Sequence, residues 1–195
     1  MPEDGMKVGV LALQGAFREH REVFDGLGAE AIEVRVSEDL AGCDSLVLPG
    51  GESTVIGKLL VSSGLLGPVG DRIRDGVPTF ATCAGLILLA REVLDRRDGD
   101  VGLDLLDLQV RRNAYGPQRQ SFEVPLAIAA LGARPFPGVF IRAPAILAVG
   151  DGAEVLAHHD DQPVLVRSGS IWAATFHPEL SGDLRLHQRF LQEVP

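Results

Sequence analysis

An apolar, strand-like run meets a helix-like run in the stretch Pro78-Thr79-Phe80-Ala81-Thr82-Cys83-Ala84-Gly85-Leu86. Small residues on both sides of Cys83 allow a sharp turn, a nucleophile elbow, that displays the cysteine at the end of the strand. In α/β enzymes this turn presents a nucleophile, and the next backbone N–H faces a developing oxyanion. A lone cysteine after a strand is more often a small buried apolar residue, so its partners must decide between the two interpretations.

Candidate partners stand at the end of another apolar run, Thr175-Phe176-His177-Pro178-Glu179-Leu180. On an extended backbone His177 and Glu179 would share one face, while Pro178 helps to end the strand. A free thiol has a pKa of about 8.5 and is mostly protonated at neutral pH, so an imidazole that takes its proton increases the reactive thiolate. A carboxylate can orient that imidazole. Cys83, His177 and Glu179 are therefore predicted to form a catalytic triad.

Strand and helix patterns alternate through the first half of the chain. Strand-like runs cover residues 6–13, 31–36, 45–48 and 78–82, and helix-like runs cover 17–27, 55–60, 69–73 and the segment from the elbow through Arg91. This alternation predicts a parallel sheet with helices between its strands. Later strand-like runs follow one another with short turns, and we expect them to be antiparallel additions to the sheet. They cover residues 105–110, 121–126, 139–141, 146–149, 164–166 and 171–176, before a closing helix over 184–194.

The composition limits the class of protein. The chain has 195 residues, of which 46% are hydrophobic, and this length favours one domain over residues 1–195. A net charge of -9, with 18 scattered Lys and Arg residues, argues against nucleic-acid binding. No run approaches the roughly 20 apolar residues of a membrane span, and the acidic start lacks the pattern of a signal peptide. We expect a cytoplasmic protein.

The remaining cysteine and histidine positions give weak signals. Two cysteines far apart fit neither a disulfide framework nor a zinc site, and Cys43 is expected to pack as an inert thiol. The segment His158-His159-Asp160-Asp161 offers metal-ligand types, but adjacent strand residues point to opposite faces and the two aspartates are typical of an exposed turn. We therefore expect neither a metal nor a cofactor.

The loop Pro49-Gly50-Gly51-Glu52-Ser53-Thr54 follows a buried strand, at the sheet edge where ligands of α/β proteins meet the backbone. Its glycines admit close approach and positive φ. A phosphate-binding loop is one alternative, but the glycine spacing does not match it. A tight turn with an N-cap at Ser53 or Thr54 is another, and it leaves Glu52 unexplained. Gln14-Gly15 ends the first strand at the same edge, where a plain turn is the alternative.

The chain resembles the class I, triad-type glutamine amidotransferases in three separated motifs: the Thr82-Cys83-Ala84-Gly85 elbow, the loop over 49–54 and the segment 176–180. Further segments narrow the resemblance to the glutaminase subunits of pyridoxal 5'-phosphate synthase. They are Leu11-Ala12-Leu13-Gln14-Gly15, Glu19-His20, Arg111-Arg112-Asn113 and Phe140-Ile141-Arg142-Ala143-Pro144. The resemblance covers essentially the whole chain. It implies a three-layer, flavodoxin-like α/β fold with a mostly parallel central sheet flanked by helices.

By this resemblance Cys83 would attack the side-chain amide of glutamine, His177 would pass a proton to the departing ammonia, and Glu179 would hold His177. Water would then release glutamate. The glutamine-binding positions carried over are Gly51, Glu52, Ser53, Arg112, Ile141 and Arg142. An arginine suits the α-carboxylate of the substrate because the guanidinium matches it as a planar fork. The backbone N–H groups of Gly51 and Ala84 are the candidate oxyanion donors.

The resemblance also implies a partner. In these enzymes the ammonia passes to a separate barrel synthase subunit, which joins it to a pentose phosphate and a triose phosphate to build pyridoxal 5'-phosphate. Gln14 and the Gly51 loop would lie near the docking face, and we hypothesise that partner binding sets the oxyanion hole. Ala81 is a departure, because the elbow of the family usually has glycine there. A positive φ at Ala81 would cost about 1 kcal/mol.

Three alternatives stay open at this point. The glutaminase partner of imidazole glycerol phosphate synthase shares the triad, although Gln14-Gly15 and Ile141-Arg142 speak against it. A catalytically silent subunit that only stabilises or regulates a partner would keep the fold, and the intact Cys83, His177 and Glu179 argue against that. A cysteine peptidase would be distinguished by testing peptides against free glutamine.

Overall fold

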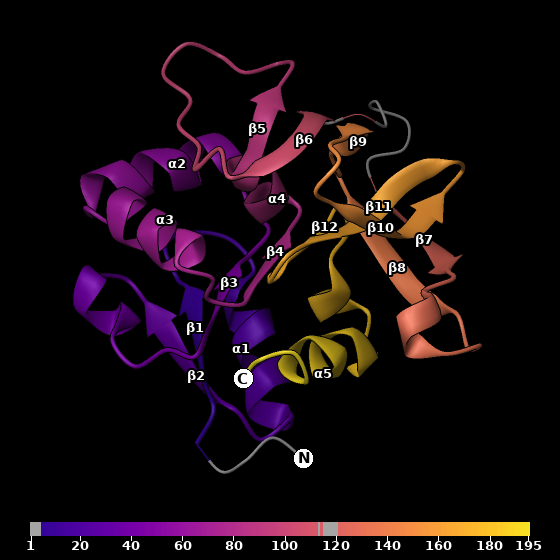
Figure 1. Cartoon of the computed structure of the whole chain (residues 1–195), viewed down its shortest axis with the longest axis horizontal. Helices are drawn as coiled ribbons and strands as arrows, with labels where there is room; N and C mark the ends of the chain where they lie inside the picture. Colours follow the sequence, from indigo (N-terminus) through magenta and orange to yellow (C-terminus); the bar gives the residue numbers. More distant parts are fainter. Residues whose placement is uncertain (1–4, 113, 115–120) are drawn as a thin grey trace.

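A seven-stranded sheet forms the centre of the molecule in the computed structural model, which describes residues 5–112, 114 and 121–195 (Figure 1). Its strand order is β10-β11-β12-β4-β3-β1-β2. The neighbours paired in parallel are β12 (Ile171–Ala174), β4 (Thr79–Thr82), β3 (Ser45–Leu48), β1 (Lys7–Leu11) and β2 (Glu30–Val34). Beyond β12, the strands β11 (Gln162–Ser168) and β10 (Glu154–His159) continue the sheet in antiparallel pairing. The predicted mostly parallel sheet is confirmed.

Two smaller sheets hold the other strands. One contains β5 (Ala90–Val93), β6 (Leu106–Arg111) and β9 (Ala145–Val149), and the other contains β7 (Ser121–Leu126) and β8 (Phe136–Ile141). The expectation that the runs of β6, β7, β8 and β9 would extend the main sheet is therefore wrong. The run over 164–166 does extend it in antiparallel pairing, as β11, whereas the run over 171–176 joins it as β12, in parallel with β4. Both edges of β6 are taken by β5 and β9, and β7 pairs with β8 along its whole length. Periodicity identifies an extended segment, but it does not say which edge that segment joins.

Helices cover both faces of the main sheet, which gives the predicted three layers (Figure 1). One face carries α2 (Ser53–Ser62), α3 (Leu66–Arg74) and α4 (Ala84–Leu89), and the other carries α1 (Phe17–Gly26) and α5 (Arg185–Leu191). Alternate strand residues serve the two cores, because successive side chains of a strand point to opposite faces. In β3, Leu46 and Leu48 pack with the α2 and α3 residues, whereas Val47 packs with Phe24 and Phe190.

The elbow helix is shorter than expected. It was predicted to continue through Arg91, but α4 ends at Leu89 and the next residues form β5, which pairs in parallel with β6. In β5 the first and last residues are buried and the two between them are exposed. Buried residues three positions apart are typical of a helix, which explains the wrong prediction.

The strand β10 was not predicted. It pairs with β11 through a turn at Asp160 and Asp161, whose φ values are 47° and 63°. Two central residues with positive φ form the tight hairpin turn that suits the twist of paired strands, and aspartate tolerates that conformation. The exposed turn predicted at these aspartates is confirmed.

No single helix in the described ranges is long and apolar enough to cross a membrane. Among the described helices, one pair, α2 and α3, reaches the required length and composition when taken together, and the two are bent by 101° at the break between them. Both helices bury one face against the core of the molecule.

The carboxyl ends of the parallel strands meet at one edge of the sheet. Gln14 comes after β1, Gly51 after β3, Cys83 after β4 and His177 after β12. Ligand sites of open α/β sheets lie outside this edge. The topology therefore gathers predicted site residues that are far apart in the sequence.

Candidate active site

Cys83 stands at the turn between β4 and α4, with φ 47° and ψ −102°. A positive φ is uncommon for a residue other than glycine, and it stores strain at the turn. Gly85 permits the turn, because a Cβ there would lie 2.9 Å from Leu48 Cβ and closer still to the Leu48 carbonyl. The positive φ falls on Cys83 and not on Ala81, which is buried inside β4. The cost considered for alanine at that position therefore does not arise.

His177 and Glu179 are hydrogen-bonded, with His177 Nδ1 2.7 Å from Glu179 Oε1. Their spacing predicted that they would share one face of a strand, and this prediction is wrong. Instead β12 ends at Ala174, and Pro178 begins the 3₁₀ helix η4 (Pro178–Leu180), which turns Glu179 back toward the imidazole. Proline suits the first position of a helix, because it lacks the N–H that would have no partner there. The expected contact between His177 and Glu179 is present, but a 3₁₀ helix and not a strand brings it about.

The surroundings of His177 favour its protonated form. Burial alone would lower the pKa of His177, but hydrogen bonds with Cys83 and Glu179, together with the charges of both, raise it to about 10. Gly50 makes room for the ring, because a Cβ there would lie 2.9 Å from His177 Nδ1 and closer still to Cε1. Since Glu179 occupies Nδ1, Nε2 is the ring nitrogen left for proton exchange with a thiol.

The Glu179 carboxylate stays ionised inside the protein. Its side chain is 0% exposed, and burial alone would raise its pKa. His20 and His177 outweigh that effect and lower the pKa of Glu179 below the usual range of a glutamate. The ionised carboxylate can therefore accept the Nδ1–H of His177 and fix the plane of the imidazole.

The loop after β3 is held from two sides. The Gly50 N–H donates to Thr82 Oγ1 at 3.0 Å, and the Gly50 carbonyl accepts from the Ala16 N–H at 2.9 Å. Gln14 Oε1 accepts from the Glu52 N–H at 2.8 Å and would lie 2.5 Å from a Cβ at position 51. Within the described ranges no protein group accepts from the Gly51 N–H. That N–H is thus free to meet a ligand.

Glu52 has a structural task that the sequence did not reveal. It is the N-cap of α2, and its carboxylate accepts from the Thr54 N–H at 3.3 Å and the Val55 N–H at 3.1 Å. The alternative of an N-cap at Ser53 or Thr54 is therefore wrong, because the helix begins one residue earlier than a Ser or Thr cap requires. A carboxylate at this position also complements the positive end of the helix dipole.

A pocket of about 220 Å³ opens beside Cys83. Its lining residues are Gln14, Gly51, Glu52, Ser53, Cys83, Ile87, Arg112, Ile141, Arg142 and His177. The structure thus gathers every residue predicted to bind glutamine around one cavity. Of the other predicted residues, Ala84 begins α4 and is buried, while Glu179 lies behind His177. Ile87 was missed, although it lies one helical turn after Cys83, and this spacing could have identified it.

The end of β8 and the residue after it also line the pocket. The Cys83 Sγ lies 4.0 Å from the Ile141 carbonyl oxygen. Arg142 follows with φ 42° and is exposed. Arg142 lines the pocket, and no ion pair of Arg142 is seen among the residues that the structure describes.

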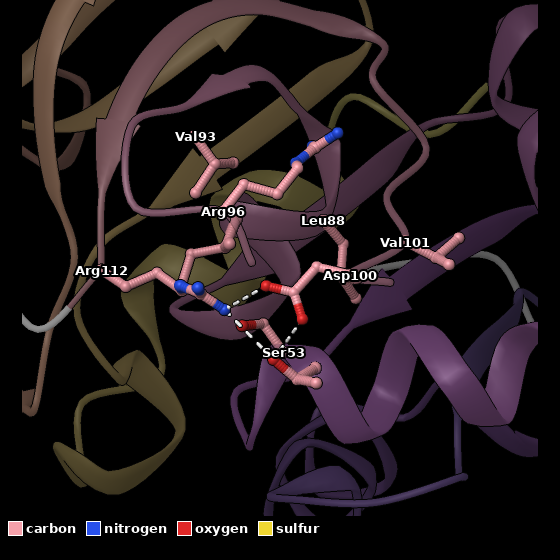
Figure 2. Close-up of a pocket in the computed structure, with 9 residues that line it drawn as sticks. Ser53, Leu88, Val93, Arg96, Asp100, Val101 and Arg112 are labelled. Carbon is pink, nitrogen blue, oxygen red and sulfur yellow. Dashed lines mark hydrogen bonds and ion pairs between the residues drawn. The ribbon is translucent and has the colours of Figure 1, made fainter. Parts of the chain in front are cut away.

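Arg112 reaches the same pocket but is already paired. Its guanidinium lies 2.8 Å from Asp100 Oδ2 and donates to Thr54 Oγ1 at 3.1 Å (Figure 2). The Thr54 hydroxyl in turn donates to the other Asp100 oxygen at 2.9 Å. Sequence reasoning identified Arg112 and missed Asp100, which lies in a loop without periodicity. A substrate carboxylate would meet an arginine that is fixed in place and partly neutralised. Asn113, quoted with Arg112 above, lies outside the described residues.

The weaker sequence signals lie outside this pocket. Burial raises the pKa of the Cys43 thiol, and its Sγ lies 3.2 Å from the Asp39 carbonyl. The His159 ring packs against Phe122 and Phe140, which stack on each other, with centroids 5.7 Å from each. In the described part of the chain, no group of three His, Cys, Asp or Glu residues is arranged to hold a metal ion.

The sequence matches known proteins along nearly its whole length. The profile of the SNO glutamine amidotransferase family matches residues 10–195. The chain belongs to the SNO glutamine amidotransferase family. Its relatives include a pyridoxal 5'-phosphate synthase subunit PdxT from Pelotomaculum thermopropionicum, which is 53% identical over 96% of this chain and 95% of the relative. The subunit of the same name from Herpetosiphon aurantiacus is 51% identical over 95% of this chain and 99% of the relative.

Solved structures share the fold of this chain. A crystal structure of a glutamine amidotransferase matches with a TM-score of 0.89 and 50% identity, over 95% of this chain and 97% of that one. PurLQS from Thermotoga maritima matches with a TM-score of 0.70 and 16% identity, over 98% of this chain and 100% of that one, which shows a shared fold alone. The predicted resemblance and fold class are confirmed.

Proposed function

We propose that this chain is a glutaminase that hydrolyses the side-chain amide of L-glutamine to L-glutamate and ammonia. The observation that carries the proposal is the arrangement of three side chains at the pocket: Cys83 and His177 both line it, and His177 Nδ1 lies 2.7 Å from Glu179 Oε1. A thiol, an imidazole and a carboxylate in this order serve as nucleophile, proton carrier and orienting group. Membership of the SNO glutamine amidotransferase family supports the proposal.

In the first half of the reaction, the Cys83 thiolate attacks the amide carbon of glutamine. The amide oxygen takes the negative charge, and the N–H groups of Gly51 and Ala84 are our candidates to bind it. His177 gives its proton to the amide nitrogen as the carbon–nitrogen bond breaks. Ammonia leaves, and the γ-glutamyl group stays on Cys83 as a thioester.

In the second half, water replaces ammonia. His177, now neutral, takes a proton from the water while the water oxygen attacks the thioester carbon. The carbon–sulfur bond breaks, glutamate leaves, and Cys83 returns as a thiolate beside a protonated His177. Glu179 keeps the same hydrogen bond to Nδ1 throughout, so the imidazole moves protons without turning.

Substrate binding uses the charges at the pocket. Arg142 and Arg112 supply positive charge for the α-carboxylate of glutamine, and Arg142 carries the larger share because Asp100 partly neutralises Arg112. Gly51, Glu52, Ser53 and Ile141 line the rest of the pocket. The proposal treats residues 1–195 as one glutaminase domain.

The ammonia, in this proposal, passes to a separate barrel synthase subunit that makes pyridoxal 5'-phosphate. Two relatives more than half identical are named as subunits of that synthase, which favours it over imidazole glycerol phosphate synthase. Ammonia released into water would mostly be protonated and lose its nucleophilicity, so direct transfer preserves it. We place the reaction in the cytoplasm, where the reducing environment keeps the unpaired Cys83 thiol reactive.

Gln14 is our candidate for coupling the partner to the site. It accepts from the Glu52 N–H and lies against Gly51, so a partner that shifts the segment carrying Gln14 also shifts the Gly51 N–H. Partner binding would then complete the oxyanion hole, and the glutaminase would be idle alone.

The test is glutamate release from glutamine by the wild type and by Cys83→Ala, each with and without the pyridoxal 5'-phosphate synthase subunit. We expect release that depends on the partner and vanishes in Cys83→Ala. The synthase subunit of imidazole glycerol phosphate synthase serves as the control partner and should leave turnover unchanged. If Cys83→Ala released glutamate at the wild-type rate, Cys83 would not be the nucleophile. Equal turnover with and without the partner would overturn the proposed coupling.

A further inference from the structure

A row of buried polar side chains lies behind Glu179. It consists of His20 on α1, Thr82 on β4 and His187 on α5, each of which is 0% exposed. His20 Nε2 lies 3.1 Å from Thr82 Oγ1 and 3.3 Å from Glu179 Oε2, and His20 Nδ1 lies 3.1 Å from His187 Nε2. Fully buried polar groups destabilise a core unless they are paired, so two buried histidines in line with the carboxylate require an explanation.

One arrangement of the imidazole protons gives every ring N–H of the two buried histidines a partner. Among the described residues, His187 Nδ1 is buried without a hydrogen-bond partner. A buried N–H without an acceptor is rarer than a bare acceptor, so the His187 proton belongs on Nε2. His187 then donates to His20 Nδ1, and the His20 proton must lie on Nε2. The His20 N–H therefore faces Thr82 and Glu179.

Burial disfavours the charged form of both histidines. Burial lowers the pKa of His20, although the nearby Glu179 charge acts in the opposite direction. Burial also lowers the pKa of His187 well below its usual value, and His20 adds to that effect. The other charged groups that act on His20 are His177 and, on its own helix, Glu19. His20 therefore serves as a hydrogen-bond donor to the Glu179 carboxylate, and His177 remains the residue that carries protons.

We propose that His20 is a positioning residue: it shares its Nε2–H between Thr82 Oγ1 and Glu179 Oε2 and so holds the carboxylate where it receives His177 Nδ1–H. This inference rests on the glutaminase mechanism proposed above. In the described ranges Glu179 Oε2 is buried and has no aligned hydrogen bond, and His20 Nε2 is the donor within reach of it. Without His20, this buried anionic oxygen would lose the side-chain donor that faces it.

His20 Nε2 also connects the Glu179 carboxylate to the loop after β3, which carries the candidate oxyanion donor Gly51. Thr82 Oγ1 accepts from the Gly50 N–H at 3.0 Å and lies 3.1 Å from His20 Nε2. Gly50 is followed by Gly51, whose N–H is a candidate oxyanion donor. His20 therefore acts on both ends of the site, through Glu179 and through Thr82.

The test compares His20→Met with His20→Gln. The two side chains are nearly equal in length and shape, but only glutamine carries N–H donors. Glutamate release by the complex with the synthase subunit is measured across a range of pH. We expect His20→Met to lower kcat by about 10- to 100-fold with KM for glutamine unchanged. Loss of the donor raises the pKa of Glu179, so the acid limb of kcat/KM moves up by about one pH unit. His20→Gln should restore that limb.

Phe24→Leu is the matched packing control. Its ring centroid lies 5.1 Å from that of His187, so the change loosens the same cluster without removing a hydrogen bond. We expect a lower Tm and an unmoved acid limb. An acid limb that stays in place in His20→Met, with activity lost only as far as Phe24→Leu loses it, would reduce His20 to a packing role and overturn the proposal.

Two further variants keep the test decisive. If His20→Met does not fold, His187→Met removes the donor that fixes the His20 tautomer, and we expect its acid limb to move in the same direction. An unmoved limb there also overturns the proposal. Glu179→Gln distinguishes a failure of the proposed glutaminase mechanism from a failure of the role given to His20. Full activity in that variant would overturn the mechanism itself.

Discussion

The Gly50→Ala substitution tests the position of the imidazole. Gly50 is buried and its φ is not positive, so alanine strains no backbone angle there. The added Cβ would lie 2.9 Å from His177 Nδ1, closer still to Cε1, and 3.3 Å from Cys83 Cβ. Since carbon contacts are favourable at about 3.5–4.0 Å, the ring must move by about 1 Å. A displacement of that size between reacting groups lowers the rate by about a hundredfold.

The assay for Gly50→Ala is steady-state glutaminase kinetics with the synthase subunit present. We expect kcat to fall about a hundredfold while the protein still folds, because the methyl group meets a side chain at the pocket and not the sheet. Gly67→Ala is the matched control, since a Cβ at Gly67 on α3 meets nothing within 4 Å. It should leave kcat unchanged. A kcat for Gly50→Ala within twofold of the wild type would refute the placement of His177 against this loop.

Other substitutions test the charges and the packing of the molecule. Arg142→Ala should raise KM for glutamine about tenfold or more with little change in Tm, whereas Arg112→Ala should raise KM and also lower Tm, because it leaves Asp100 without its partner; equal Tm values for the two variants would contradict this. Hydrogen bonds from Arg185 lower the pKa of Asp183 to about 2, so its stabilisation is full above the unfolded pKa of about 3.9 and is lost as pH falls toward 2. Asp183→Asn should therefore be less stable than the wild type at neutral pH, and the gap measured by denaturant unfolding should close between about pH 4 and pH 2; a gap that is constant with pH would show that the charge is not responsible. Gly85→Ala should destabilise the fold by about 1–3 kcal/mol or more, because its Cβ would overlap the Leu48 backbone, and an unchanged Tm would contradict the close packing of α4 on β3.

The sequence identified the three groups of the predicted triad because each stands in a strong local context. Cys83 follows an apolar strand and precedes small residues, and His177 and Glu179 follow another strand. Their backbone was misjudged, since a spacing of two residues fits both a strand and the 3₁₀ turn that Pro178 begins. Local patterns thus predicted which residues lie close together better than they predicted the backbone that carries them.

The groups that surround the triad could not be predicted in the same way. His20 and His187 lie on different helices, and a helical pattern shows only that each faces a core. That they meet each other behind Glu179 depends on how α1 and α5 pack on the same face of the sheet. The pairing of Arg112 with Asp100 likewise depends on a loop whose path no periodicity encodes.

The separate small sheets were missed for a related reason. The strand patterns of β6 to β9 were correct, but alternation fixes which face of a strand is buried and leaves its partner open. The edge of β6 is taken by β5, a short segment with helical spacing. Because β5 was predicted as part of a helix, its pairing with β6 was not expected.

The central claim is that Cys83 carries the γ-glutamyl group during glutamine hydrolysis. The most direct measurement is intact-protein mass spectrometry of the complex with the synthase subunit, quenched with acid during turnover and followed by peptide mapping. The account predicts a mass increase of one γ-glutamyl group on the peptide that contains Cys83, and none in Cys83→Ala, which should also release no glutamate. Glutamate release that continues in Cys83→Ala, with no adduct on that peptide in the wild type, would contradict it.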